Sequence, residues 1–294
     1  MMAKERDMLS IKHILFPVDY SERCCHAVPF VASMARSFGA KITLLSAAQP
    51  FYYGAGDPGG AVVVDEGEIL DEMKERLGGA LTREFGDIEV ERVVELGDAA
   101  TVIAEFAHTN GVDLVMMPTH GYGRFRNLLL GSVTAKVLHD VECAVWTAAH
   151  VEKYSSGGHI GCRHVLCAVD ATPKSVPLMQ WAAQYAKDLG ATLRMVHVIP
   201  QEEGRHLIAM ESTFEEDVRR ETRAQIERLQ ISAGVTAPLC VTTGNIAEGV
   251  REEARRHGAD LVVIGRGILH ETLGRLRTHA YGIIRQSPCP VLSI

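Results

Sequence analysis

The sequence predicts an α/β fold that occurs twice in tandem, each copy a doubly wound, five-stranded parallel sheet with helices on both faces. Three observations support this prediction. The 294 residues amount to about two domains of roughly 150 residues each. The second half repeats the first. Within each half, short apolar runs alternate with helical patterns. This alternation is typical of parallel sheets, because crossover helices join their neighbouring strands.

The repeat aligns at two offsets. The stretch around His13 matches the stretch around His164 at an offset of 151 residues, and the stretch from Gly97 matches the stretch from Gly244 at an offset of 147. A duplication followed by a short deletion explains both. We therefore predict a first domain over 1–149 and a second over 163–294. Polar, glycine-rich sequence at 150–162 is the predicted linker.

The elements of the first half follow from its pattern. Runs rich in Val, Ile and Leu predict strands at 12–18, 41–47, 89–95, 113–117 and 143–148. Helices are expected at 21–38, 66–85, 98–109 and 132–140. In the first of these, Phe30, Met34 and Phe38 recur at helical spacing and Gly39 supplies a stop. The second half repeats the order, with a long charged helix over 210–232.

Composition narrows the classes of function. Lys and Arg number 30 against 37 Asp and Glu, a net charge of −7, so no attraction to nucleic acid or anionic lipid is expected. The N-terminus lacks a signal-peptide core, and no apolar run approaches the roughly 18 residues of a membrane span, so we expect a cytoplasmic protein. The seven cysteines lack zinc-type C-x-x-C pairs and are interpreted as reduced thiols, and no metal site is expected.

The loop after the fourth predicted strand has the parts of a phosphate site. Ligands of doubly wound sheets bind beyond the carboxyl ends of the strands, where the winding reverses. Here Gly121 is followed by nine residues and then by Gly131-Ser132 at the start of a helix. A helix N-terminus offers unpaired N–H groups, to which Thr134 and Arg124 would add a hydroxyl and a positive charge. The alternative is that Ser132 only caps the helix and that the glycines only permit a turn.

Two better-known phosphate motifs are absent from the sequence. There is no G-x-x-x-x-G-K-[ST], and no G-x-G-x-x-G follows the first strand. P-loop NTPases and dinucleotide dehydrogenases are thereby excluded.

The loop after the first strand carries Asp19, and Asp170 holds the matching place in the second half. A carboxylate there could accept hydrogen bonds from a base or a ribose hydroxyl. Alternatively it begins a turn, because Asp19 with Glu22 resembles a capping arrangement and Thr172-Pro173 is a ready helix start. The sequence leaves both interpretations open.

Taken together, these residues resemble the universal stress protein family in its tandem form. Members that bind ATP carry G-x-x-G, nine residues and G-[ST] after strand 4, and an Asp after strand 1. The first half meets every motif position except the first, where Pro118 replaces glycine. Because proline has no N–H, this predicts weakened binding. The resemblance implies an adenine nucleotide alpha hydrolase-like, Rossmann-like fold.

The motif and the resemblance together indicate a set of nucleotide contacts in the first half. Asp19 and the Ala47 backbone would lie on the adenine side, and Gly121, Gly131, Ser132 and Val133 would meet the phosphates. The complete candidate set is Pro17, Val18, Asp19, Ala47, Pro118, His120, Gly121, Arg124, Gly131, Ser132, Val133 and Thr134.

The second half departs further from the family motif. Gly265 and Gly267 stand one residue too close together, and nine residues beyond Gly267 the sequence has Arg277-Thr278 instead of Gly-Ser. We expect this second site to be impaired or empty, or Arg277 to serve a different anion. The weaker candidates here are Asp170, Val198, Gly265, Gly267, Arg277 and Thr278.

These features predict a regulatory module that binds an adenine nucleotide, ATP, ADP or AMP, with Mg²⁺ as a further expectation, and that signals to an unidentified protein partner. One alternative is a nucleotide-free stress protein that acts through protein contacts; another is a slow ATPase. Against an enzyme, the sequence shows no positioned base, catalytic lysine or paired carboxylates. The resemblance also implies a pseudo-dimer within one chain through pairing of the last strands, and a homodimer beyond it.

Overall fold

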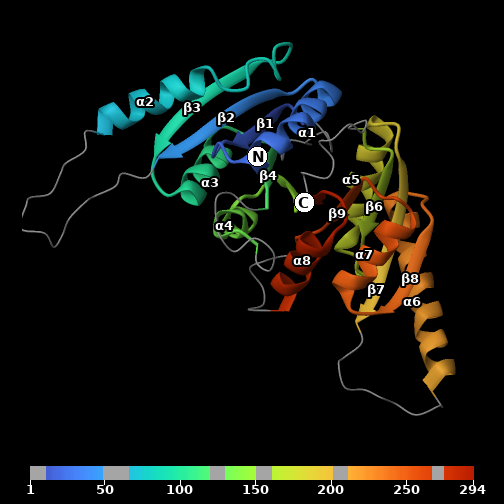
Figure 1. Ribbon diagram of the computed structural model, residues 1–294. Helices are drawn as coiled ribbons and strands as arrows, with labels where there is room; N and C mark the ends of the chain where they lie inside the picture. The colour runs from blue at the N-terminus through green and yellow to red at the C-terminus, as the bar shows by residue number, and fades with distance from the viewer. Residues whose placement is uncertain (1–10, 49–65, 120–129, 150–160, 201–210, 267–274) are drawn as a thin grey trace, which may run out of the picture. The chain divides into compact units, whose positions relative to one another are not determined.

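The computed structural model describes residues 11–48, 66–119, 130–149, 161–200, 211–266 and 275–294. They divide into two compact units (Figure 1). The first unit runs from Ile11 to Trp146, and the second comprises Gly161–Ile294 with the residues that follow Trp146. The predicted linker at 150–162 lies outside the described residues except at its last two positions.

The first unit has the strand order β3-β2-β1-β4-β5, and the described pairings β1 with β2, β1 with β4 and β2 with β3 are parallel. Its elements are β1 (His13–Pro17), α1 (Glu22–Phe38), β2 (Lys41–Ala48), α2 (Glu66–Gly78), β3 (Val90–Leu96), α3 (Ala99–Thr109), β4 (Leu114–Pro118), α4 (Ser132–Asp140) and β5 (Ala144–Ala148). The chain winds outward from β1 through β2 to β3, then returns past β1 to β4 and β5.

The second unit repeats this arrangement with the order β10-β9-β6-β7-β8 and parallel pairings. Its elements are β6 (His164–Ala168), α5 (Ser175–Asp188), β7 (Thr192–Pro200), α6 (Glu211–Ala233), β8 (Leu239–Gly244), α7 (Ile246–Arg256), β9 (Leu261–Ile264), α8 (Arg275–Gln286) and β10 (Val291–Ser293). The predicted doubly wound α/β fold, present twice, is confirmed.

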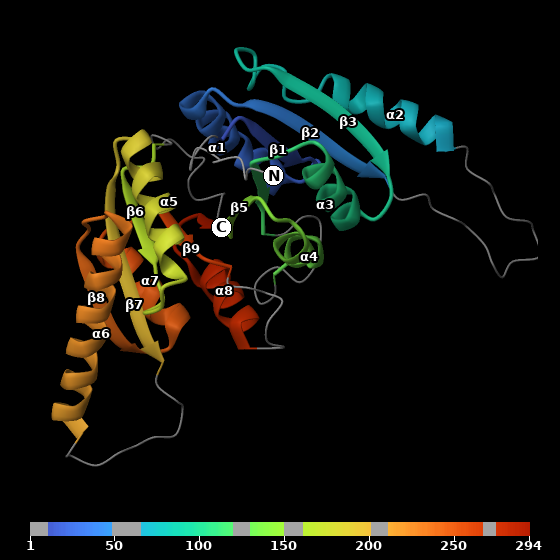
Figure 2. The ribbon, with the colours of Figure 1, turned by 180° about the vertical axis from the view of Figure 1, so that it is seen from behind.

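Right-handed crossovers place α1 and α2 on one face of the first sheet, and α3 and α4 on the other. Figures 1 and 2 show α2 lying along β3 and α3 beside α4. The central strands lie between these layers: every residue of β4 is buried, as are the first four of β1. The carboxyl ends of β1 and β4 therefore adjoin at one edge of the sheet.

Local signals explain where most helices end. Gly39 takes a left-handed conformation at φ 60° after α1 and its N–H donates to the Ala35 carbonyl, as predicted. The prediction for α2 was wrong at its end, because the helix stops at Gly78 instead of continuing to residue 85. The Gly78-Gly79 pair and Leu81, at φ 55°, explain the early stop, since glycine disfavours helix and a positive φ breaks it. Among the described residues, no helix is both long and apolar enough to cross a membrane.

Candidate functional site

The end of β1 is bonded to β2 beside it. The Val18 N–H donates to the Leu45 carbonyl at 2.8 Å, and the Ser46 hydroxyl donates to the Val18 carbonyl at 3.3 Å. Val18 is buried, whereas Pro17 and Ala47 are partly exposed. The predicted adenine-side residues therefore occupy neighbouring strand ends, which are joined by one backbone bond and one side-chain bond.

Asp19 is exposed directly after this strand end. Its Oδ1 accepts a hydrogen bond from the Ser21 N–H at 3.0 Å, and Ser21, rather than Asp19, caps α1 by accepting from the Cys24 N–H at 3.1 Å. These contacts support the turn interpretation of Asp19. Its role toward a base or ribose stays a prediction.

Tyr20 is a residue that sequence reasoning missed. It has a positive φ of 60°, which is uncommon for a residue with a side chain. The guanidinium of Arg76, on α2, stacks over its ring at 3.8 Å from the centroid. Burial raises the pKa of the Tyr20 hydroxyl. No local sequence signal marks this contact, because Arg76 lies 56 residues further along the chain.

The end of β4 and the start of α4 are joined directly. Pro118 and Thr119 are buried, and the Gly131 N–H donates to the Thr119 carbonyl at 2.9 Å. The chain is thus held together at Thr119 and Gly131, on either side of residues 120–129. Gly131 holds the N-cap position of α4, with φ −56° and ψ 142°, and makes no side-chain cap bond.

Ser132 is the exposed first residue of α4, so the alternative that Ser132 caps this helix is wrong. Glycine lacks a capping side chain, and the first N–H groups of an α-helix have no partner within the helix. With no capping side chain among the described residues, partial positive charge is concentrated at this helix end, on the carboxyl edge of the sheet. Such an end suits an anion.

Thr134 differs from its predicted role as an open hydroxyl. It is buried, and its Oγ1 donates to the carbonyls of Pro118, at 3.2 Å, and Thr119, at 3.3 Å. The hydroxyl thus ties the first turn of α4 to the end of β4. Val133 is partly exposed beside it.

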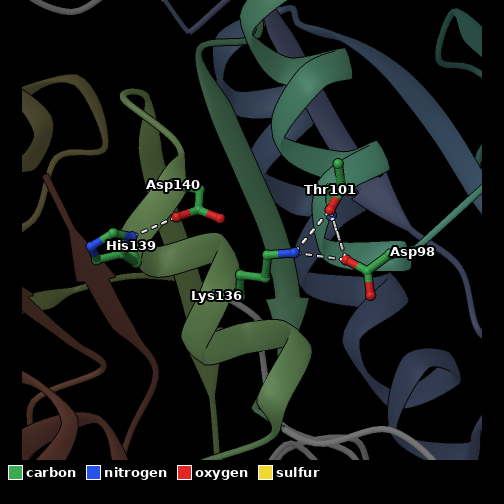
Figure 3. Close-up of polar contacts among 5 residues, drawn as sticks. All are labelled: Asp98, Thr101, Lys136, His139 and Asp140. Carbon is green, nitrogen blue, oxygen red and sulfur yellow. Dashed lines mark hydrogen bonds and ion pairs between the residues drawn. The ribbon is translucent and has the colours of Figure 1, made fainter.

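Lys136 lies one turn further along α4 and was also missed (Figure 3). Its Nζ donates to Asp98 Oδ1 at 2.9 Å and to Thr101 Oγ1 at 2.8 Å, joining α4 to the N-terminus of α3. Asp98 also caps α3 by accepting from the Thr101 N–H at 3.0 Å. The spacing of Lys136 from Ser132, one helical turn, is the signal that could have placed it near the site.

Several predicted residues lie outside the described part of the chain: His120, Gly121 and Arg124 in the first half and Gly267 in the second. The first-half residues that the structure does describe come from β1, β2, β4 and α4. Whether His120, Gly121 and Arg124 join them stays a prediction.

The second half differs at the corresponding helix. Arg277 and Thr278, which align with Gly131-Ser132, lie inside α8, because this helix already begins at Arg275. Asp170 is exposed after β6, and its N–H donates to Ser175 Oγ at 3.0 Å.

Val198 and Gly265 complete the described candidates of this half. Val198 is buried against α7. Gly265 follows β9, with a Leu178 methyl 3.5 Å from the position that a Cβ would take. The bare helix start of the first half thus has no counterpart at the aligned residues.

Comparison with known proteins agrees with the duplicated fold. The model of the universal stress protein family matches residues 10–148 and again residues 161–294. The chain belongs to the universal stress protein family. The two matches make it a tandem universal stress protein.

Individual relatives support the assignment. Universal stress protein A homolog 1 of Coxiella burnetii is 28% identical over 137 residues, which are 45% of this chain and 95% of that protein. A universal stress protein from Archaeoglobus fulgidus superimposes with a TM-score of 0.64 at 20% identity, over 97% of this chain and 96% of that one. A functionally unknown protein from Pseudomonas aeruginosa PAO1 gives 0.62 at 17% identity, over 98% and 93%. These two structures share the tandem fold with this universal stress protein.

Proposed function

We propose that the first half binds an adenine nucleotide, ATP in the first instance, with its phosphates at the N-terminus of α4. The observation that carries this proposal is the bare start of α4, where glycine holds the N-cap at the carboxyl edge of a doubly wound sheet. Asp19 and Ala47, at the ends of the neighbouring strands, lie on the side proposed for adenosine.

The proposed role is regulatory. ATP held by the first half stabilises one conformation or assembly, which a partner protein reads by its differential affinity for the two states. Mg²⁺ with the nucleotide, pairing of the last strands, a homodimer and a cytoplasmic location all stay predictions. They rest on the sequence and the family resemblance.

Two variants of Ser132 test the phosphate site. Ser132→Ala removes the hydroxyl, whereas Ser132→Pro also removes the first backbone N–H of α4, and proline is tolerated at the first helical position. A charge-assisted hydrogen bond contributes about 1.5–3 kcal/mol, so Ser132→Pro is expected to weaken ATP binding about tenfold or more in calorimetric titrations.

Ala99→Pro is the matched control, since Ala99 is the first residue of α3 and follows its cap, Asp98. This variant is expected to bind ATP as the unchanged protein does. If both proline variants weakened ATP binding equally, the effect would come from helix stability. If Ser132→Pro did not weaken ATP binding, α4 would not contact the phosphates.

The nucleotide-free alternative is supported by Pro118 and by the altered motif of the second half. Pro118 at the end of β4 is buried and offers no N–H at the family's first glycine position. Denaturing freshly purified protein and separating the released small molecules decides between the functions. ATP supports the proposal, ADP that accumulates with turnover indicates a slow ATPase, and no nucleotide supports a protein that acts through contacts alone.

A further inference from the structure

The second unit contains a cavity of about 470 Å³ at the opposite, amino edge of its sheet. It lies where β6 and β7 begin and α7 ends. The lining includes His164, Leu166, Thr192, Arg194, Pro238 and His257. Its volume falls within the range of roughly 300–1,000 Å³ that is usual for small-molecule sites.

The first unit fills the same position with side chains. His13 is buried, its Nε2 lies 2.8 Å from Thr43 Oγ1, and its ring meets Phe106 edge-on with centroids 6.5 Å apart. In the repeat alignment, Glu253 replaces Phe106 and Arg194 replaces Thr43. Loss of the phenylalanine ring and exposure of His164, the partner of His13, leave the second unit open here.

The charged groups at this position differ in whether they have ion-pair or hydrogen-bond partners. Glu253 is buried, and its carboxylate lies near three cationic or titratable groups: His257 Nε2 at 3.0 Å, Arg256 Nη1 at 3.4 Å and Arg194 Nη2 at 3.7 Å. Its negative charge is thus already matched. By contrast, Arg194 Nε is a buried donor with no hydrogen-bond partner among the described residues. Other protein atoms cover Nε, but the Arg194 side chain is 34% exposed and lines the cavity, so its positive charge lies at the cavity wall.

We propose that this cavity binds a small organic monocarboxylate. The carboxylate pairs with the Arg194 guanidinium, and the apolar body of the ligand packs against Leu166 and Pro238. A cationic ligand is disfavoured, because the Glu253 carboxylate is already paired and the Asp260 carboxylate accepts the Arg163 and His164 N–H groups. The first half holds no such ligand at this edge, since Phe106 and His13 occupy the space.

Benzoate tests the proposal on the full chain, with benzylamine as a probe of the same ring and opposite charge. Benzoate is expected to shift the ring resonances of His164 and His257 saturably in NMR spectra, and benzylamine to leave them unchanged. Arg194→Gln is expected to weaken benzoate binding about tenfold or more, the effect of losing a charged hydrogen bond. Arg220→Gln, on the exposed face of α6, is the matched control and should bind as the unchanged protein does.

A second variant, Ala259→Leu, tests the proposal even if Arg194→Gln does not fold. Ala259→Leu extends into the cavity and leaves every charged group in place, and the first half already carries the larger Val112 at this position. It is expected to abolish the saturable shifts. Shifts that do not saturate, an equal response to benzylamine, or unchanged benzoate affinity in Arg194→Gln or Ala259→Leu would each overturn the proposal.

Discussion

Asp98 combines two roles in one carboxylate. It caps α3 through the Thr101 N–H and binds the Lys136 ammonium on α4 (Figure 3). The pKa of Asp98 is lowered to about 2. The Lys136 ammonium makes the largest contribution, and the hydroxyl and N–H of Thr101 also lower this pKa. In the second half, Asn245 caps α7 at the aligned position without a charge.

This lowered pKa predicts a specific dependence of stability on pH. A carboxyl whose pKa is lower in the folded state contributes stability above its unfolded pKa of about 3.9, and the contribution is lost as pH falls toward 2. Asp98→Asn keeps a capping side chain but cannot titrate. Urea unfolding from pH 5 to pH 2 should therefore show a shallower loss of stability in Asp98→Asn than in the unchanged protein.

Asp71→Asn provides the comparison for this experiment, because Asp71 is exposed on α2 and its ion pair among the described residues, to Lys74 at 3.6 Å, lies within one helical turn. It should follow the unchanged protein over the same pH range. Parallel curves for Asp98→Asn and the unchanged protein would show that the ion pair to Lys136 does not form in solution.

At the scale of elements, the sequence predicted the strands and most helices to within a residue or two, because apolar periodicity and glycine stops are local signals. The end of α2 was mispredicted, since the turn after Gly78 contains Leu81 in a conformation that glycine usually takes. The bare start of α4 could be predicted from Gly131-Ser132. The buried hydroxyl of Thr134, the ion pair of Lys136 and the stacking of Arg76 on Tyr20 could not, because each joins residues distant in the chain.

The packing of α7 on β7 depends on one glycine. A Cβ placed on Gly249 would lie 2.7 Å from Val198 Cγ2, closer than side chains tolerate. Gly249→Ala is therefore expected to lower the free energy of unfolding by about 1–3 kcal/mol, the usual cost of overpacking. Urea or thermal unfolding measures it.

Gly78→Ala is the control for this substitution, because a Cβ there meets nothing within 4 Å. It should change stability by less than about 0.5 kcal/mol, or raise it slightly. Combining Gly249→Ala with Val198→Ala should recover part of the loss by making room. If Gly249→Ala destabilised the protein no more than Gly78→Ala, β7 and α7 would move apart at little cost.

At the scale of the whole molecule, the duplicated halves keep the strand order but differ where ligands would bind. At the carboxyl edge, α4 begins at Ser132 behind a glycine, whereas α8 begins before the aligned Arg277-Thr278. At the amino edge, the first half is filled and the second is open. The repeat could be read from the sequence, but the cavity could not, because it requires knowing that Phe106 and Glu253 occupy equivalent packing positions.

The asymmetry at the carboxyl edge predicts the nucleotide stoichiometry. If the first half alone binds, as proposed, calorimetric titration or native mass spectrometry should give one adenine nucleotide per chain. Two equivalent sites per chain would contradict the inference drawn from the early start of α8 and would assign Arg277 a place beside a nucleotide.

The stacking of Arg76 on Tyr20 has a mechanical consequence. Tyr20 directly follows Asp19. Arg76 of α2 therefore contacts the turn at the end of β1, although β2 lies between β1 and β3 in the sheet. A displacement of α2 would therefore break a contact made by the residue next to Asp19. A helix at the edge of the first sheet thus contacts the turn that follows its central strand.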